Sequence, residues 1–261
     1  MKKSLLDVIF ASDKRKGVLL LLQHGQQEMS YLLKELNTSR QALLPQIKIL
    51  KEHDLVLQQE DAYELTAMGT LVASRMKPFI DTLETLDKNR DYFTAHDISG
   101  IPEPFLKRIR EIKDSILIEP EYVNVHDLNT DYQAEGFRSK SIYFVYTFMH
   151  PGVPSVLQEL MDRKIHVEVI NTPELIQKLT TEMPAACEHF FPYENLEMYI
   201  YNEDIRISSL TVTDSGFLLR LLGKNGEFSN KQLIVSGEKG RKWGKELYEY
   251  YKKDAKLITE I

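Results

Sequence analysis

Residues 32–50 constrain the fold of this chain more than any other stretch. A short apolar helix is expected to end at Leu36-Asn37, the capping pair Thr38-Ser39 follows, and a second helix begins at once. Two helices joined by so short a turn form a helix-turn-helix, whose second helix is shaped to lie in the major groove of DNA. Residues 55–58 and 62–65 flank turn residues and predict a small β-wing. Together these elements predict an amino-terminal winged helix.

The second helix is expected to have one buried and one exposed face. Leu43, Ile47 and Leu50 recur at helical spacing and should face the core. The residues expected to meet double-stranded DNA are Thr38, Ser39, Arg40, Gln41, Leu44 and Lys48. Arginine can donate twice to guanine, glutamine pairs with adenine, and leucine can touch a thymine methyl group. Hydroxyls and lysine suit phosphates, which fix register without identifying the sequence. An ordinary solvated helix face is the alternative explanation of the charged residues.

Two local features weaken this prediction. Pro45 lies about six positions into the second helix, where it removes a backbone hydrogen bond and costs about 3 kcal/mol in a straight helix. Nothing in the sequence explains why a proline is tolerated there. The turn of the wing, residues 58–61, contains two amides and two carboxylates, so it is poorly suited to grip phosphate.

The charge distribution is compatible with a local DNA-binding face. The whole chain has a net charge of −6, but residues 1–56 carry nine basic and six acidic side chains, a balance of +3. A positive face of this size predicts modest non-specific affinity for phosphate. No apolar run approaches the ~18 residues that a membrane span requires, and Asp7 interrupts any signal-peptide core. We therefore expect a cytoplasmic protein with no membrane partner, and its single cysteine, Cys187, excludes an intrachain disulfide.

A long helix is expected to follow the wing, from Thr66 to about Tyr92. Its apolar residues have heptad spacing, at Val72, Met76, Phe79, Leu83 and Leu86. This face could pack on the second domain of the same chain or form a homodimer, and Pro78 should kink the helix. The glycine and prolines of residues 96–104 indicate a boundary. The predicted domains are residues 1–92 and 93–261.

The second domain has the pattern of an α/β mixed sheet. Residues 142–147 and 165–170 are β-branched apolar runs separated by an amphipathic helix over 153–163, which predicts a parallel pair of strands with a right-handed connection. Three further strand candidates, residues 196–201, 205–212 and 217–222, are joined by short turns and predict an antiparallel meander. The overall fold class is therefore α+β, in two domains joined by the long helix.

Most catalytic signatures are absent from the sequence. There is no phosphate-binding loop and no nucleophile elbow. His166-Val167-Glu168 matches one part of a zinc deaminase, but the second, cysteine-containing part is missing. Cys187-Glu188-His189 is more often structural than a metal site. We therefore predict no catalytic residues, no metal and no cofactor.

Several motifs resemble a known family. Residues 37–41 and 44–48 are similar to archaeal winged-helix transcription regulators of methanogens. Residues 148–151, 212–214 and 243–251 are similar to their carboxy-terminal FilR-type methanogenesis-regulatory domain. The resemblance implies a phospholipase-D-like α/β sensor domain. Because no histidine here is followed two positions later by lysine, the phospholipase nucleophile motif is missing, and a binding module is favoured over an enzyme.

The expected function is a DNA-binding transcription regulator that forms a homodimer and whose second domain senses a ligand or partner. The candidate residues for a small-molecule effector are His150, Asp214, Arg220 and Lys231, which lie at predicted strand ends or turns. Ordinary loop polarity explains each of them equally well. The alternative function is a phospholipase-D-like hydrolase with an accessory winged helix. The recognition face distinguishes the two, since a regulator needs Arg40, Gln41 and Lys48 exposed together.

Overall fold

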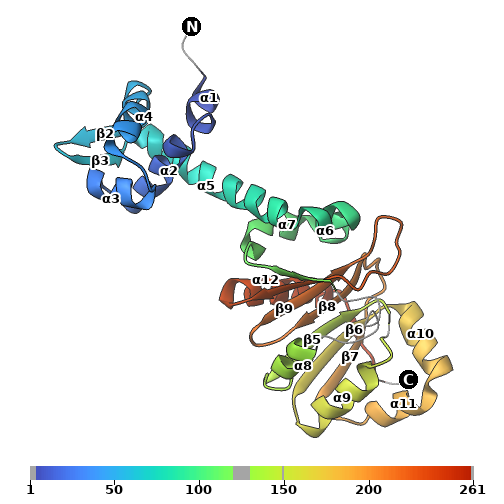
Figure 1. Ribbon diagram of the computed structural model, residues 1–261. Helices are drawn as coiled ribbons and strands as arrows, with labels where there is room; N and C mark the ends of the chain where they lie inside the picture. Colours follow the sequence, from blue (N-terminus) through green and yellow to red (C-terminus); the bar gives the residue numbers. More distant parts are fainter. Residues whose placement is uncertain (1–3, 120–129, 149, 260–261) are drawn as a thin grey trace. The chain divides into compact units, whose positions relative to one another are not determined.

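The computed structural model describes residues 4–119, 130–148 and 150–259 (Figure 1). Met149 of the motif quoted above therefore lies outside the described residues, as do residues 1–3. The chain divides into two compact units, Met1–Leu83 and Glu84–Ile261. The division comes before the expected boundary at residue 92 because Tyr92 is fully buried in the core of the second unit. No helix of the described residues is both long and apolar enough to cross a bilayer.

The first unit is a winged helix. Its elements are α1 (Leu5–Phe10), α2 (Asp13–Leu21), the 3-10 turn η1 (Leu22–His24), β1 (Gln27–Glu28), α3 (Met29–Glu35), α4 (Arg40–Glu52), β2 (Val56–Gln59), β3 (Ala62–Leu65) and the beginning of α5 (Ala67–Lys88). The three strands form an antiparallel sheet in the order β1-β3-β2. The helix-turn-helix and the wing are thus confirmed, while the short strand β1 had no signal in the sequence.

Hydroxyl side chains begin four helices of this unit. The Oγ of Ser4 accepts a hydrogen bond from the backbone N–H of Asp7 at 3.2 Å at the start of α1. The Oγ of Ser12 accepts a hydrogen bond from the backbone N–H of Arg15 at the start of α2, and Ser39 does the same for Ala42 at 3.3 Å at the start of α4. Thr66 accepts from Gly69 at 2.8 Å at the start of α5. These caps satisfy amide groups that have no partner within the helix. The short turn before α4 is closed by Asn37, whose φ is +43°.

Helix α5 differs from its expected length and packing. It ends at Lys88, and α6 (Arg90–Ala95) is a separate helix, so the expected end at Tyr92 is wrong. The helix continues through Pro78. Met76 is buried in the winged-helix core, but Phe79 and Leu83 are 53% and 44% exposed. The apolar residues with heptad spacing therefore pack on the winged-helix core only in the first half of α5.

The second unit contains an eight-stranded mixed sheet. Its small helices are α6, η2 (Ile98–Gly100), α7 (Glu103–Leu106), η3 (Ile109–Ile112), α8 (Thr130–Gly136) and α11 (Pro184–Phe190). Its larger helices are α9 (Val153–Asp162), α10 (Pro173–Glu182) and α12 (Glu238–Lys252). Its strands are β4 (Ile116–Ile118), β5 (Ser141–Tyr146), β6 (His166–Asn171), β7 (Leu196–Ile200), β8 (Ile207–Val212), β9 (Gly216–Leu221), β10 (Gln232–Ser236) and β11 (Lys256–Leu257).

The sheet order is β11-β7-β6-β5-β8-β9-β10-β4. Strands β5 and β6 are parallel neighbours joined through α9, as predicted. The expected meander is wrong at its first step, because β7 pairs in parallel with β6 and does not pair with β8. Strand β8 crosses to the other side of β5 and pairs with it antiparallel. The hairpin of β8 and β9 is confirmed.

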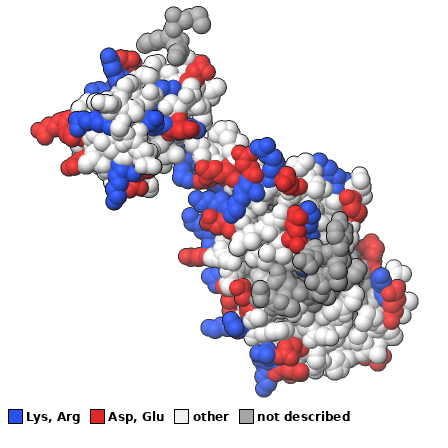
Figure 2. Space-filling view, in the orientation of Figure 1, with Lys and Arg blue, Asp and Glu red and all other residues white. Residues whose placement is uncertain are grey.

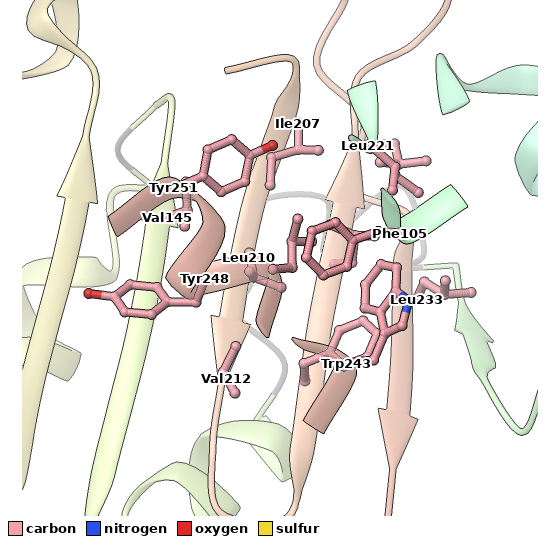
Figure 3. Packing of buried hydrophobic residues seen from close by; sticks show 14 of the residues in the cluster. Phe105, Val145, Ile207, Leu210, Val212, Leu221, Leu233, Trp243, Tyr248 and Tyr251 are labelled. Atoms are coloured by element: carbon pink, nitrogen blue, oxygen red, sulfur yellow. The ribbon is translucent and has the colours of Figure 1, made fainter. Parts of the chain in front are cut away.

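Each face of this sheet carries its own core. On one face, α12 packs over β8 and β9, and Figure 3 shows Tyr251 close to Ile207 and Trp243 close to Phe105 and Leu233. The Trp243 ring stacks on Phe217 with ring centroids 5.1 Å apart. On the other face, residues of α9, α10 and α11 pack against β5 and β6. Successive residues of a strand point to opposite faces, so β8 and β9 contribute to both.

Candidate functional site

The exposed face of α4 is the first candidate site. Leu43, Ile47 and Leu50 are at most 1% exposed, so they anchor the helix on the winged-helix core, as predicted. The opposite face presents the exposed side chains Arg40, Gln41, Leu44, Pro45 and Lys48. Helix α4 runs through Pro45 without interruption. Because proline has no N–H, Pro45 leaves out the hydrogen bond that a residue at this position would otherwise donate to the carbonyl of Gln41.

The two hydroxyl residues before α4 are placed differently. Ser39 is exposed and caps the helix, so its Oγ already accepts one backbone hydrogen bond. Thr38 is half-buried, and its backbone N–H donates to the carbonyl of Leu33 at 3.1 Å. Both lie at the amino terminus of α4, where the partial positive charge of the helix dipole favours an anion such as a phosphate.

The cations of α4 are exposed but not isolated. Arg40 Nη2 lies 2.9 Å from Asp61 Oδ1 at the tip of the wing, and both side chains are more than half exposed. Lys48 is 3.9 Å from Glu52, and Lys51 donates to Gln58 of the wing at 2.8 Å. On the face shown in Figure 2, Lys and Arg of the first unit lie interspersed with Asp and Glu. The cations of α4 are therefore accessible to solvent, and each also has an acidic or polar side chain beside it.

The wing is short and acidic at its tip. Strands β2 and β3 are joined by Glu60 and Asp61, and Glu60 has a φ of +55°. Two carboxylates at the tip would repel phosphate at low ionic strength. The wing therefore offers little direct attraction to a DNA backbone.

The second candidate site is a cavity in the second unit. It lies where β5, β8 and β9 face helices α8 and α9, and its volume is about 70 Å³. That volume is enough for several water molecules or for part of a small organic ligand. Most of its lining is aliphatic and aromatic. The polar side chains in the lining come from Tyr132, Gln133, Tyr146, His150, Ser209, Thr211, Thr213 and Arg220.

Arg220 is the charged residue of this cavity. It lies on β9, is 7% exposed, and donates from Nε to Asn230 Oδ1 at 3.0 Å and from Nη1 to Ser209 Oγ at 3.3 Å. Burial lowers the pKa of the guanidinium, which nevertheless stays protonated because its ordinary pKa exceeds 12. Burial also raises the pKa of Tyr146, in the same lining, to about 12. The cavity thus joins a fixed positive charge to neutral hydroxyl groups.

The structure brings together two of the four residues predicted to bind an effector. His150 lines the cavity with Arg220, and its Nδ1 accepts a hydrogen bond from the backbone N–H of Gly152. Asp214 is exposed in the turn between β8 and β9, where it accepts from the backbone N–H of Lys140 at 2.8 Å. Lys231 forms an ion pair with Glu119 at 2.8 Å. Neither Asp214 nor Lys231 lines this cavity.

Sequence reasoning missed the residues that hold Arg220. Ser209 and Asn230 lie 11 and 10 residues from it in sequence and meet it only through pairing of β8 with β9 and the path of the chain before β10. One usable signal was present, namely an arginine inside the apolar run 217–222. A charged residue within a buried strand usually has a specific partner.

The sequence elements considered for metal or nucleophilic chemistry have structural roles here. Glu168 is buried and accepts hydrogen bonds from Tyr248 at 2.7 Å and from Lys252, so it joins β6 to α12. His166 contacts its other oxygen at 3.1 Å. Burial raises the pKa of the Cys187 thiol, which disfavours the nucleophilic thiolate. Within the described ranges, no three acidic, cysteine or histidine side chains gather as a metal site would require.

Comparison with protein families identifies both parts of the chain. Residues 126–254 match the family model described as the middle domain of the methanogenesis regulatory protein FilR1. Residues 4–88 match the family model of the HVO_A0261 N-terminal domain. The predicted resemblance to FilR-type winged-helix regulators is therefore confirmed.

One curated protein is similar along almost the entire chain. The methanogenesis regulatory protein FilR1 of Methanothrix harundinacea (strain 6Ac) is 23% identical over 258 residues, which cover 97% of this chain. They cover 58% of the relative, so the chain spans little more than half of that protein's length.

Two solved structures show a looser overall likeness. The archaeal chromatin protein TrmBL2, whose structure shows a novel mode of DNA binding, aligns over 97% of both chains with 9% identity and a TM-score of 0.44. Nuc, a phospholipase D family member from Salmonella typhimurium, aligns over 50% of this chain and 90% of its own, with 13% identity and a TM-score of 0.40.

Proposed function

We propose that this chain, which joins an HVO_A0261-type N-terminal domain to a FilR1-type middle domain, is a DNA-binding transcription regulator controlled by a small effector. The observation that carries the proposal is the exposed face of α4, which presents Arg40, Gln41 and Lys48 over a fully packed winged-helix core. A rigid helix with exposed base-specific donors is what major-groove recognition requires. The name of the curated relative, a regulatory protein, supports the same function.

In this proposal the residues of α4 have distinct roles. Arg40 and Gln41 contact base edges, and Leu44 contacts a thymine methyl group. Ser39 and Thr38 present the amino terminus of α4 to a phosphate, and Lys48 contacts a second phosphate. Arg40 must exchange Asp61 for the DNA. That exchange costs little because both side chains are more than half exposed.

We also infer that the regulator binds DNA as a two-fold dimer. Within the first unit, helices α1 and α5 enclose an apolar groove whose lining includes Leu6, Phe10, Leu71 and Phe79. Leu6, Leu71 and Phe79 are 69%, 62% and 53% exposed, an amount of apolar surface that favours burial against a second copy. A two-fold axis would place the two α4 helices about 34 Å apart, one turn of DNA.

The second unit would bind the effector in the cavity beside Arg220 and His150 without turning it over. The hydrolase alternative has no supporting observation, because the His-x-Lys motif of phospholipase D enzymes is missing from the sequence. The effector would act by preferring one of two conformations of the chain, with a coupling of about 1–3 kcal/mol. We propose α5 as the element that carries this coupling, since the chain passes through it from one unit to the other.

The decisive experiment is selection of duplexes from a random pool by the full chain, followed by fluorescence anisotropy on the enriched site. The proposal predicts a recurring, two-fold symmetric site that the unaltered protein binds well above random duplex at physiological salt. The variant Gln41→Ala should lose the preference at one base pair in each half-site. An unenriched pool, or equal binding of enriched and random duplex, would contradict the proposed function.

A further inference from the structure

The charge of Arg220 is not balanced within the cavity that it lines. Among the described cavity residues there is no aspartate, glutamate or lysine. Burial lowers the pKa of this guanidinium, and among the described residues the opposing electrostatic influences come from the hydroxyl groups of Tyr146, Tyr92 and Tyr132. A guanidinium that is 7% exposed and has no anionic partner within the described part of the chain is costly to bury. An anion that enters the cavity removes that cost.

The guanidinium of Arg220 is fixed by two hydrogen bonds that use only part of its N–H donors. A guanidinium has five N–H donors, and the hydrogen bonds to Asn230 and Ser209 use one on Nε and one on Nη1. These two anchors come from different segments and fix the plane of the group. Among the residues that the structure describes, no hydrogen bond uses the Nη2 donors or the second Nη1 donor, which are therefore available to a ligand. A planar acceptor with two oxygens matches such a fork bidentately.

The rest of the cavity defines what the anion must carry. Phe137, Phe144 and Leu160 are part of an extensive apolar lining, so the body of the ligand should be apolar. The described lining offers one permanent positive charge, which balances a singly charged group better than a phosphate dianion. A volume of about 70 Å³ restricts the part of the ligand that the cavity encloses to a few carbon atoms.

We propose that this cavity binds a small organic monocarboxylate, whose carboxylate is held by Arg220 and whose apolar body packs against Phe137, Phe144 and Leu160. As an account of the effector this rests on the proposed function, but the binding site itself does not. Ser209 and Asn230 act as positioning residues, since they orient the guanidinium without needing to touch the ligand.

The test uses the full chain at pH 7 and isothermal titration calorimetry with butyrate, benzoate, their neutral amides butyramide and benzamide, and inorganic phosphate. At least one carboxylate should bind, and its amide, which has the same shape without the charge, should bind at least about tenfold more weakly. This comparison needs no substitution. Equal binding of acid and amide, binding of phosphate in preference to both acids, or no binding of either acid would overturn the proposal.

Three variants locate the binding. Arg220→Gln should weaken the carboxylate at least about tenfold, and Arg220→Lys, which keeps the charge but loses the fork, should give an intermediate affinity. The matched control is Arg206→Gln, at an arginine that is half exposed and paired with Asp97. Undiminished binding by a folded Arg220→Gln or Arg220→Lys, checked by circular dichroism, would refute the role of Arg220.

The same ligands separate this inference from the proposed function. Carboxylate binding with no effect on the affinity for the selected duplex would leave the site established and refute its role in regulation. Carboxylate binding by a chain that selects no duplex would refute the proposed function alone. Duplex selection without any carboxylate binding would refute the inference alone.

Discussion

Arg40 at the start of α4 and Asp61 at the tip of the wing form an ion pair, with Nη2 and Oδ1 2.9 Å apart. The contact spans 21 residues of sequence and connects the two elements that flank a bound duplex in a winged helix. Exposed pairs of this kind contribute about 0–1 kcal/mol to stability. The pair therefore does little to hold the fold together, and its main effect is on the charge of the exposed face of α4.

Replacing Arg40 with alanine should weaken binding to the selected site by about 1–3 kcal/mol and relax the preference at one base pair. The physical reason is the loss of a bidentate contact to a base. Anisotropy titrations on specific and random duplexes measure both effects. Arg90→Ala, at an exposed arginine paired with Asp87 in the second unit, is the matched control and should bind normally. Equal discrimination by Arg40→Ala and the unaltered protein would disprove the contact.

Replacing Asp61 with asparagine should strengthen binding to random duplex by up to about 1 kcal/mol. The change removes a negative charge from the wing and releases Arg40 from its intramolecular partner. The gain should shrink as salt rises, because the attraction to phosphate is screened. Titrations at two salt concentrations test this. Unchanged or weaker binding at low salt would show that Asp61 does not oppose the DNA backbone.

Replacing Phe79 with glutamate should convert the proposed dimer into a monomer. Phe79 is 53% exposed and packs edge-to-face on Phe10, with ring centroids 6.3 Å apart, beside the apolar groove of α1 and α5. A charge placed there would be desolvated in a dimer. Sedimentation velocity at micromolar concentration measures the state. Leu57→Glu, at a leucine of the wing that is 49% exposed, is the control. A monomeric unaltered protein would refute the dimer itself.

The loss of stability of the second unit at acidic pH should depend on Glu168. Burial alone would raise its pKa, but the hydrogen bonds from Lys252, Tyr248 and His166 outweigh burial and hold that pKa below its usual range. A carboxylate with a depressed pKa in the folded state stabilises the protein above its unfolded pKa of about 4.3, and this stabilisation disappears as pH falls through the folded value.

Glu168→Gln should therefore be less stable than the unaltered protein at pH 7, and its stability should fall less between pH 5 and the acid transition. Urea unfolding at a series of pH values measures this difference. Glu203→Gln, at an exposed carboxylate, should leave the pH profile unchanged. If Glu168→Gln and the unaltered protein lose stability in parallel on acidification, the carboxylate contributes nothing to the loss of stability at acidic pH.

Replacing Gly244 with alanine should destabilise the second unit by about 1–3 kcal/mol. A Cβ at this position of α12 would lie 2.6 Å from atoms of the Phe217 ring, on which Trp243 stacks. Thermal unfolding measures the change. Lys242→Ala, at an exposed position of the same helix, should have little effect. An unchanged midpoint for Gly244→Ala would show that α12 can move away from β9 at no cost.

The sequence signals that proved correct are local ones. Ser39 and Thr66 mark helix starts because a capping hydroxyl acts on an amide three residues away. The order of the sheet could not be predicted in the same way, since the choice of β5 over β7 as the neighbour of β8 depends on long-range pairing. The division into compact units at Leu83 also depends on long-range contacts. The Tyr92 hydroxyl accepts a hydrogen bond from the backbone N–H of Leu221, 129 residues away.

The same contrast between local and long-range signals applies to the candidate site. The sequence predicted the exposed and buried faces of α4 correctly, because helical periodicity alone determines which residues share a face. Of the cavity residues, Arg220 and His150 were identified but their partners were not. Asp214 instead accepts a hydrogen bond from the backbone N–H of Lys140, and Lys231 pairs with Glu119. The residue types found at predicted strand ends could not reveal these partners.

The alternation along β9 has a consequence for how such proteins diversify. Phe217, Leu219 and Leu221 belong to the core beneath α12, while Leu218 and Arg220 line the cavity on the opposite face. Neighbouring positions of one strand are therefore under different constraints, packing beneath α12 for one set and the shape and charge of the cavity for the other. A descendant gene could exchange Leu218 or Arg220 and change the shape and charge of the cavity while inheriting an intact scaffold, so new properties could arise here without first losing the old fold.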